Sequence, residues 1–366
     1  MNPFRYSGPV ASTEVINRRA ELDALLNTAE SANNSRLLAP REFGKTSLLQ
    51  KLIEEAAGQG WATVYVDFFG VMSLADVADR VESAYRKQLT GELGAWFETV
   101  RRRFPSIRLG GGPVPASVDV DARPGEKPLI ERLDAPLQIL EKRGVRTLVV
   151  FDEFQDVLEA RQDADEVIRS VIQHHGEAAS YVFAGSELGV MRELFASRRR
   201  AFYRQAGRID LEPLGESDLG EYILDRFSTG GKSIGAEALG ALLDCCAGHP
   251  RCAMLLAHEL WERTPGDVPA DLDVFDEAER FALENVSSDL RSIWRGMTRS
   301  DRELLTKLSR GEAPYSRAEG ATKNPGGAVK AAIVRLEDAG EIVNGAGGYR
   351  IVDPFLAELI RRDWNP

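Results

Sequence analysis

The segment RLLAPREFGKTSLLQKL, residues 36–52, decides the fold. A short apolar run ends at Ala39, a turn follows, and the residues from Lys45 onward have a helical pattern. The apolar residues that share one face of this predicted helix are Leu48, Leu49, Leu52 and Ile53. A strand, a glycine turn and a helix in this order present backbone N–H groups to an anion at the helix N-terminus. The segment therefore predicts a phosphate-binding loop.

The residue types in this loop predict how a nucleotide binds. Lys45 is expected to reach the β- and γ-phosphates, and the Thr46 hydroxyl is expected to hold Mg²⁺. The residues predicted to contact the nucleotide are Ala39, Pro40, Arg41, Phe43, Gly44, Lys45, Thr46 and Ser47. Two positions depart from the pattern, since Ala39 replaces its first glycine and Glu42 places an acid where phosphate is expected. A strand, turn and helix also occur without a nucleotide, so a second feature is needed.

That second feature is TLVVFDEFQDV, residues 147–157. Its apolar run ends in Asp152 and Glu153, at the carboxyl end of a predicted buried strand, where open α/β sheets bind their ligands. We expect Asp152 to bind Mg²⁺ and Glu153 to polarise the attacking water. Alone, this segment also fits a strand followed by an acidic helix cap. Together with the phosphate loop, it favours a nucleotide site.

Short apolar runs that alternate with helical patterns predict the rest of the core. They cover residues 36–39, 62–68, 147–153 and 180–186, with a fifth strand expected at 208–214. Such runs predict a parallel sheet with helices on both faces, the P-loop NTPase type of α/β fold. We place this core at residues 1–212, with a β-rich insertion near 105–128.

The remaining residues predict two smaller domains. Helical patterns without strands indicate a helical lid over residues 213–285. Residues 286–366 follow the order helix, helix and two short strands, which is typical of a winged helix-turn-helix.

These motifs resemble those of AAA+ and STAND ATPases, especially the archaeal ATPase-like branch. The resemblance covers nearly the whole chain and also includes INRRAEL (16–22), GHP (248–250) and YRIVDPFLAELIRR (349–362). It implies ATP and Mg²⁺ as ligands and ATP hydrolysis as the activity.

The resemblance also implies roles for residues outside the two main motifs. Arg18 is expected near the adenine, and Pro250 and Arg251 are expected to contact the nucleotide from the lid. Ser186 is expected to orient the water or the γ-phosphate, although a Gly-Ser pair after a strand is also an ordinary turn. Arg204 and Arg208 are candidates for an arginine finger that acts on a neighbouring subunit, although a basic helical surface is the favoured explanation for them.

Composition limits the partners. The 366 residues carry a net charge of -11, which argues against extensive electrostatic binding to nucleic acid. Residues 286–366 have 13 Lys and Arg against 11 Asp and Glu, a balance of +2, so the other residues carry -13. The predicted recognition helix offers two cations, Lys330 and Arg335, and therefore little phosphate affinity. DNA is therefore an alternative partner that the charge distribution does not favour.

The chain is expected to be cytoplasmic and not to interact with membranes. No apolar run approaches the ~18 residues that span a bilayer, and the N-terminus lacks the pattern of a signal peptide. Cys245, Cys246 and Cys252 are interpreted as small buried residues rather than metal ligands.

Three functions are consistent with the sequence. We favour an ATP-hydrolysing switch in which the core closes against the lid and winged helix, with an unknown protein partner or self-assembly. The alternative is a DNA-associated AAA+ ATPase of the origin-binding or transposition-helper kind. The third is a nucleotide-binding scaffold without turnover.

Overall fold

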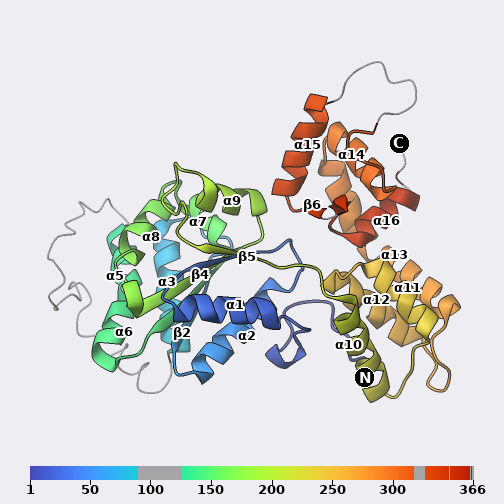
Figure 1. The fold of residues 1–366 in the computed structure, drawn as a ribbon, viewed down its shortest axis with the longest axis horizontal. Helices are drawn as coiled ribbons and strands as arrows, with labels where there is room; N and C mark the ends of the chain where they lie inside the picture. The colour runs from blue at the N-terminus through green and yellow to red at the C-terminus, as the bar shows by residue number, and fades with distance from the viewer. Residues whose placement is uncertain (90–125, 317–325, 346, 363, 365–366) are drawn as a thin grey trace. The chain divides into compact units, whose positions relative to one another are not determined.

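The computed structural model describes residues 1–89, 126–316, 326–345, 347–362 and 364 (Figure 1). Its contacts divide the chain into two units. The sheet unit contains Arg18–Ala39 and Lys45–Leu211. The helical unit contains Met1–Asn17, Pro40–Gly44 and Glu212–Pro366. The expected β-rich insertion near 105–128 lies almost wholly outside the described residues.

The sheet unit is built on five parallel strands in the order β2-β3-β4-β1-β5. Their bounds are β1 Ser35–Leu38, β2 Ala62–Asp67, β3 Thr147–Asp152, β4 Ala179–Gly185 and β5 Gly207–Asp210. Every residue of β3 and β4 is buried, as near-continuous apolar runs predict for strands covered on both faces. The predicted parallel sheet is confirmed, although β5 ends before Leu211.

Helices flank this sheet on both sides (Figure 1). Their bounds are α1 Arg19–Glu30, α2 Lys45–Gly58, α3 Leu74–Gln88, α5 Glu126–Leu133, α6 Ala135–Arg143, α7 Val157–Ala160, α8 Ala164–Ile172 and α9 Leu188–Ala196. Short 3-10 turns cover Phe154–Asp156 and Gly176–Ala178. The N-cap of α3 is Ser73, whose side chain accepts a hydrogen bond from the Asp76 N–H.

Aromatic side chains fix the two central strands against the turn that follows β3. The Phe154 ring lies 4.7 Å from that of Phe183 on β4 and 5.3 Å from that of Phe202, measured between centroids. Phe154 is fully buried. Because Phe154 follows Glu153 directly, this packing fixes where the Glu153 backbone lies at the end of the sheet.

The helical unit contains most of the C-terminal half of the chain. Its elements are a 3-10 turn at Ser12–Glu14, α10 Glu216–Thr229, α11 Ala236–Cys246, α12 Pro250–Arg263, α13 Leu272–Gly296, α14 Arg299–Ser309, α15 Gly326–Asp338, β6 Ile342–Gly345, β7 Gly348–Ile351 and α16 Pro354–Arg362. The strands β6 and β7 form an antiparallel pair. Helix α13 continues through the position where we placed the boundary between lid and winged helix, and one apolar cluster spans both parts. The winged-helix assignment stays a prediction.

Gly248 connects the first part of this unit to α12. Its φ is +76°, and its carbonyl accepts a hydrogen bond of 2.9 Å from the Leu214 N–H. A Cβ at this position would lie 2.5 Å from the Leu214 carbonyl oxygen. Both the left-handed backbone and the close approach therefore require glycine here.

The N-terminal residues pack into the helical unit, which the sequence did not predict. The Phe4 ring is 2% exposed and lies 5.4 Å from that of Phe227 on α10. The carbonyl of Phe4 lies 2.9 Å from Nδ1 of His258 on α12. Arg226 forms an ion pair of 3.3 Å with Glu14. The first residues of the chain therefore belong to the core of a unit formed mainly by its last residues.

The three cysteines are free, and Cys246 and Cys252 are buried. Burial raises the pKa of the Cys246 thiol to about 11, so it stays protonated and behaves as a small apolar residue. Within the described ranges, none of the helices is long and apolar enough to cross a membrane.

Candidate functional site

The acidic pair after β3 lies at the carboxyl end of the sheet. Asp152 is the last residue of β3 and is 3% exposed. Glu153 adopts a left-handed backbone with φ 47° and ψ 45°. Such a conformation is uncommon for a residue with a side chain and persists only where surrounding contacts hold it. The burial of Phe154 and the hydrogen bonds of the Glu153 carboxylate supply those contacts.

Lys45 joins both acids. It is the first residue of α2 and is 7% exposed. Its ammonium donates a hydrogen bond to Asp152 and another, of 2.6 Å, to Glu153. One buried cation between two carboxylates leaves a net charge of -1, and removal of Lys45 would leave two neighbouring carboxylates with little water around them. We refer to Lys45, Asp152 and Glu153 as the acid-lysine cluster.

Tyr65 on β2 completes the surroundings of Asp152. Its hydroxyl donates a hydrogen bond of 2.5 Å to one Asp152 oxygen, and the Glu153 N–H donates one of 2.9 Å to the other. Burial, followed by the nearby Asp152 charge, raises the pKa of the Tyr65 hydroxyl well above its usual value. Tyr65 is therefore a permanent donor that fixes the position of the Asp152 carboxylate.

Glu153 is held in its ionised form. Its second oxygen accepts hydrogen bonds of 2.9 Å from the Ser186 hydroxyl and 2.6 Å from Nε2 of Gln155. Burial opposes ionisation of this carboxyl, but the ammonium of Lys45 and these hydrogen bonds outweigh it, so the pKa of Glu153 is lowered. A lowered pKa means that Glu153 is present as a carboxylate, the form that can accept a proton.

Gly185, the last residue of β4, lets Gln155 approach. A Cβ at this position would lie 2.3 Å from Oε1 of Gln155. Glycine here therefore allows the Gln155 side chain to lie against the strand end and to hold Glu153. The Gly-Ser pair at the end of β4 serves the site twice, since Ser186 is itself a donor to Glu153.

The loop before Lys45 makes its contacts within the helical unit. Glu42 has a φ of 67°, and its carboxylate forms an ion pair of 2.9 Å with Arg251 on α12. The Phe43 ring is 4% exposed and meets the edge of the His249 ring, with centroids 5.0 Å apart. Burial, followed by the charge of Arg251, lowers the pKa of His249 to about 4. The neutral ring caps α12 by accepting a hydrogen bond from the Cys252 N–H.

The remaining loop residues divide between exposed and buried positions. Ala39 is fully buried, Arg41 and Gly44 are exposed, and Ser47 is buried in the first turn of α2. Gly44 has a φ of 83°, a left-handed conformation that glycine adopts without strain. Thr46 is half-buried in the same turn.

The donor set fits Mg²⁺ together with a polyphosphate better than it fits a metal alone. Among the described residues, no group of three or more His, Cys, Asp or Glu side chains could hold a metal ion. Mg²⁺ in phosphate-transfer sites takes one or two protein oxygens, and the substrate phosphates and water supply the others. The Asp152 carboxylate and the Thr46 hydroxyl are oxygen ligands of this kind.

The predicted arginine fingers lie elsewhere on the sheet unit. Arg208, on β5, forms an ion pair of 2.7 Å with Asp210. Two strands, β4 and β1, separate β5 from β3, which places the backbones of Arg208 and Asp152 about 14 Å apart at about 4.8 Å per strand. Arg208 therefore does not belong to the acid-lysine cluster.

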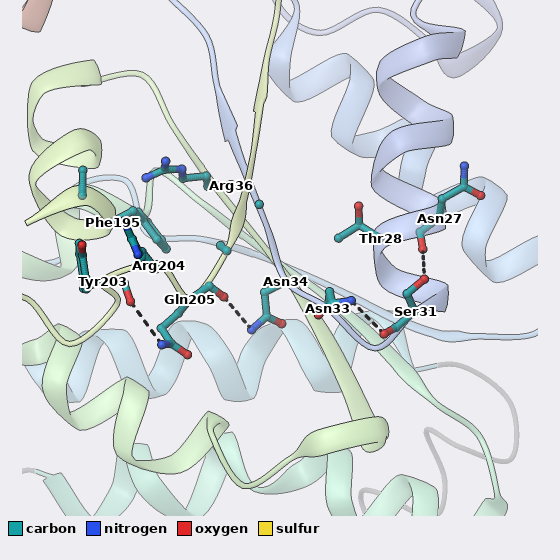
Figure 2. A pocket seen from close by; sticks show the side chains of 13 residues that line it. Asn27, Thr28, Ser31, Asn33, Asn34, Arg36, Phe195, Tyr203, Arg204 and Gln205 are labelled. Carbon is teal, nitrogen blue, oxygen red and sulfur yellow. Dashed lines mark hydrogen bonds between the residues drawn. The ribbon is translucent and has the colours of Figure 1, made fainter.

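Arg204 lies at a recess of about 810 Å³ that the amino ends of β1 and β5 help to form (Figure 2). Its guanidinium lies 5.2 Å from the centre of the Tyr203 ring, and that of Arg36 lies 5.6 Å from the centre of the Phe195 ring. The recess is thus lined by two cations, each beside an aromatic ring, and none of the described residues that line it is acidic. Arg204 and Arg208 do not contact the acid-lysine cluster of their own chain.

Arg18 and Pro250 occupy the starts of two helices. Arg18, the N-cap residue of α1, is 6% exposed and forms an ion pair of 2.9 Å with Glu21. Pro250 is the first residue of α12, where the missing N–H of proline costs nothing.

The structure brings together some of the predicted residues and adds others. Lys45, Asp152, Glu153 and Ser186 form one connected group. Sequence reasoning missed Tyr65 and Gln155. Gln155 lies two residues after Glu153, which was a usable signal. Nothing in the sequence of β2 pointed to Tyr65, because its role depends on the pairing of β2 with β3.

No protein-family model matches the chain, and no curated protein matches it by sequence. Solved structures do match. The Walker-type ATPase of Pyrococcus abyssi is similar with a TM-score of 0.68 and 18% identity over 98% of this chain and 99% of that chain. The ORC2 protein of Aeropyrum pernix is similar in its ADPNP-ADP complexes with a TM-score of 0.57 and 16% identity, over 97% of this chain and 96% of that chain. In its ADP form the corresponding values are 0.52 and 17%. The chain therefore shares the fold of these structures, a parallel sheet of the P-loop type with helices and a helical C-terminal region.

Proposed function

We propose that this protein binds ATP with Mg²⁺ and hydrolyses it slowly, and that the bound nucleotide switches the helical unit between two states. One observation carries the proposal. A lysine at the start of the helix after the phosphate loop is buried against two carboxylates at the carboxyl end of a central strand, with Ser186 and Gln155 holding the second carboxylate. The ADPNP and ADP complexes of the structurally similar ORC2 protein support a nucleotide as the ligand.

The residues of the acid-lysine cluster have separate tasks in this proposal. The ammonium of Lys45 leaves the carboxylates and neutralises the β- and γ-phosphates. Asp152 and Thr46 hold Mg²⁺, which neutralises charge on the phosphate oxygens when bound. Tyr65 keeps the Asp152 carboxylate oriented through its 2.5 Å hydrogen bond.

Glu153 acts on the attacking water. The water oxygen forms a bond to the γ-phosphorus while the bond from that phosphorus to the bridging oxygen breaks, so ADP leaves with the electron pair. The water proton passes to the Glu153 carboxylate, which can accept it once Lys45 has moved to the phosphates. Ser186 and Gln155 orient the Glu153 carboxylate. Turnover is expected to be slow, because Glu153 must first lose its 2.6 Å contact with Lys45.

Arg251 links the nucleotide to the helical unit in this proposal. It lies in the first turn of α12 and is about one-third exposed, so it is accessible to an anion. A phosphate contact with Arg251 that exists only in the bound state would favour that state. Arg18 near the adenine, and Arg204 or Arg208 acting on a second copy, remain parts of the proposal that require their own tests.

The contacts of the C-terminal cations do not favour the DNA-associated alternative. Arg335, one of two cations of the predicted recognition helix, forms an ion pair of 2.6 Å with Asp301. Arg299 pairs with Glu303 at 2.8 Å, and Lys307 donates a hydrogen bond of 2.5 Å to the Ser316 carbonyl. Residues 286–366 carry a net charge of only +2, so this segment presents little positive charge to a phosphate backbone.

A binding measurement tests the proposal. Calorimetric titration with ATP and Mg²⁺ should give saturable binding to the wild type, and phosphate release should follow. Lys45→Ala should abolish binding, whereas Lys51→Ala, on the same helix α2, should bind normally. Equal binding by wild type and Lys45→Ala would contradict the assignment of the site.

A further inference from the structure

Three consecutive residues of the phosphate loop, Arg41, Glu42 and Phe43, interact with other residues of the helical unit. Arg41 lies close enough to Glu341, just before β6, for its charge to oppose the rise that burial and Asp353 cause in the pKa of Glu341. Glu42 forms its ion pair with Arg251, and Phe43 packs against His249. The loop expected to receive phosphate is therefore held by the side chains of His249 and Arg251 at the start of α12.

The Glu42 contact differs from the other two because the negative charge of the Glu42 carboxylate repels the phosphates of the predicted ligand. One nitrogen of Arg251, Nη1, donates a hydrogen bond of 3.0 Å to Oε2 of Glu42 and lies 2.9 Å from Oε1. The left-handed backbone of Glu42, with a φ of 67°, persists only where contacts compensate it. The carboxylate of Glu42 thus occupies one nitrogen of the guanidinium with a charge of the same sign as that of a phosphate.

A second carboxyl group adds to the charge around Arg251. Asp353, before α16, is half-buried and accepts hydrogen bonds of 2.8 and 3.2 Å from the N–H groups of Phe355 and Leu356. Burial, and after it the charge of Glu42, raise the pKa of Asp353, whereas Arg251 opposes the rise. Arg251 therefore compensates two acidic groups, and loss of its contact with Glu42 changes the charge balance at the start of α16.

We propose that Glu42 is an internal competitor for phosphate, which holds Arg251 in the nucleotide-free state and thereby lowers the affinity for ATP. This inference rests on the proposed function. It assigns to Glu42 the role of setting the affinity and gives Arg251 two exclusive partners, Glu42 and the nucleotide. The release of Glu42 on nucleotide binding is then the event that reports the nucleotide to α12 and α16.

A cycle of variants tests the competition. We expect Glu42→Gln to tighten ATP binding about fivefold to tenfold, since it removes a repulsive charge and frees Arg251. In an Arg251→Met background most of this gain should disappear, because no freed arginine remains to bind phosphate. Glu14→Gln is the matched control, because Glu14 also pairs with an arginine, Arg226, in the helical unit at similar exposure. This control should leave ATP affinity unchanged.

The outcomes separate this inference from the proposed function. If the wild type does not bind ATP, the proposed function is wrong and the competition fails with it. If the wild type binds and Glu42→Gln binds equally, only the competition is wrong. If Glu42→Gln gains the same factor with and without Arg251, Glu42 acts by simple repulsion and the exchange of partners is refuted.

Discussion

Two groups of charged residues, one in each unit, differ in burial and in the number of charges that they bring together. Lys45, Asp152 and Glu153 belong to the sheet unit, and Lys45 and Asp152 are 7% and 3% exposed. Glu42 and Arg251 belong to the helical unit, with side chains 41% and 36% exposed. Burial makes the first group costly to disturb, whereas water screens the second and makes it easy to exchange. We infer that chemistry is assigned to the buried group and switching to the exposed one.

The largest expected effect concerns the chemical role of the buried group. Glu153→Gln should lower the rate of ATP hydrolysis by about 10²-fold to 10⁴-fold, because it removes the base that accepts the water proton. ATP binding should persist, since Gln keeps the size of the side chain. Phosphate release under single-turnover conditions, alongside binding of a fluorescent ATP analogue, measures both. Unchanged turnover would favour the nucleotide-binding scaffold.

The second prediction concerns the stability of the same group. Lys45→Met should destabilise the sheet unit by about 3 kcal/mol, because Asp152 and Glu153 are left as neighbouring acids without their cation. Urea unfolding followed by circular dichroism at pH 7 measures the change. Most of the lost stability should return at pH 5, where one acid can take up a proton. If the variant is as stable as the wild type at pH 7, water compensates the charges of Asp152 and Glu153 without Lys45, and the prediction is wrong.

The third prediction uses the titration of His249 beside Phe43. The folded pKa is about 4 and the unfolded value is 6.5, so the unfolded state takes up a proton first as the pH falls. Stability of the helical unit is then fully present above pH 6.5 and declines by about 3 kcal/mol toward pH 4. His249→Asn keeps a capping side chain and removes the titration. Its unfolding free energy should depend less on pH than that of the wild type over this range.

The smallest expected effect is the stability of the exposed pair. Glu42→Gln and Arg251→Met should each change the unfolding free energy by less than about 1 kcal/mol, because exposed ion pairs contribute little. Urea unfolding under the conditions used for Lys45→Met allows a direct comparison. If either variant loses as much unfolding free energy as Lys45→Met, the exposed pair and the acid-lysine cluster do not differ in their contribution to stability.

The sequence predicted much of the sheet unit because its signals are local. Apolar runs placed all five strands, and Lys45, Asp152 and Glu153 followed from what comes directly before or after a strand. The contribution of Ser186 to the Glu153 carboxylate agrees with its position after β4. Tyr65 was missed, because its partner Asp152 lies 87 residues away and is reached only through strand pairing.

The helical unit was less predictable because its contacts join distant segments. Phe4 packs with Phe227 and Trp261, and nothing near Phe4 in the sequence indicates this. Likewise, the sequence left open where the Glu42 side chain points. Its partner Arg251 is 209 residues away.

The sequence by itself determined the succession of strands and helices along the chain and the types of side chain at the ends of the strands. These features follow from periodicity and turn chemistry, which act over a few residues. Tertiary structure decided the partners of those side chains. It placed Lys45 between two carboxylates, gave Asp152 a tyrosine donor, and paired the acid of the phosphate loop with Arg251. These pairings depend on strand order and on packing between distant segments, which local sequence patterns do not encode.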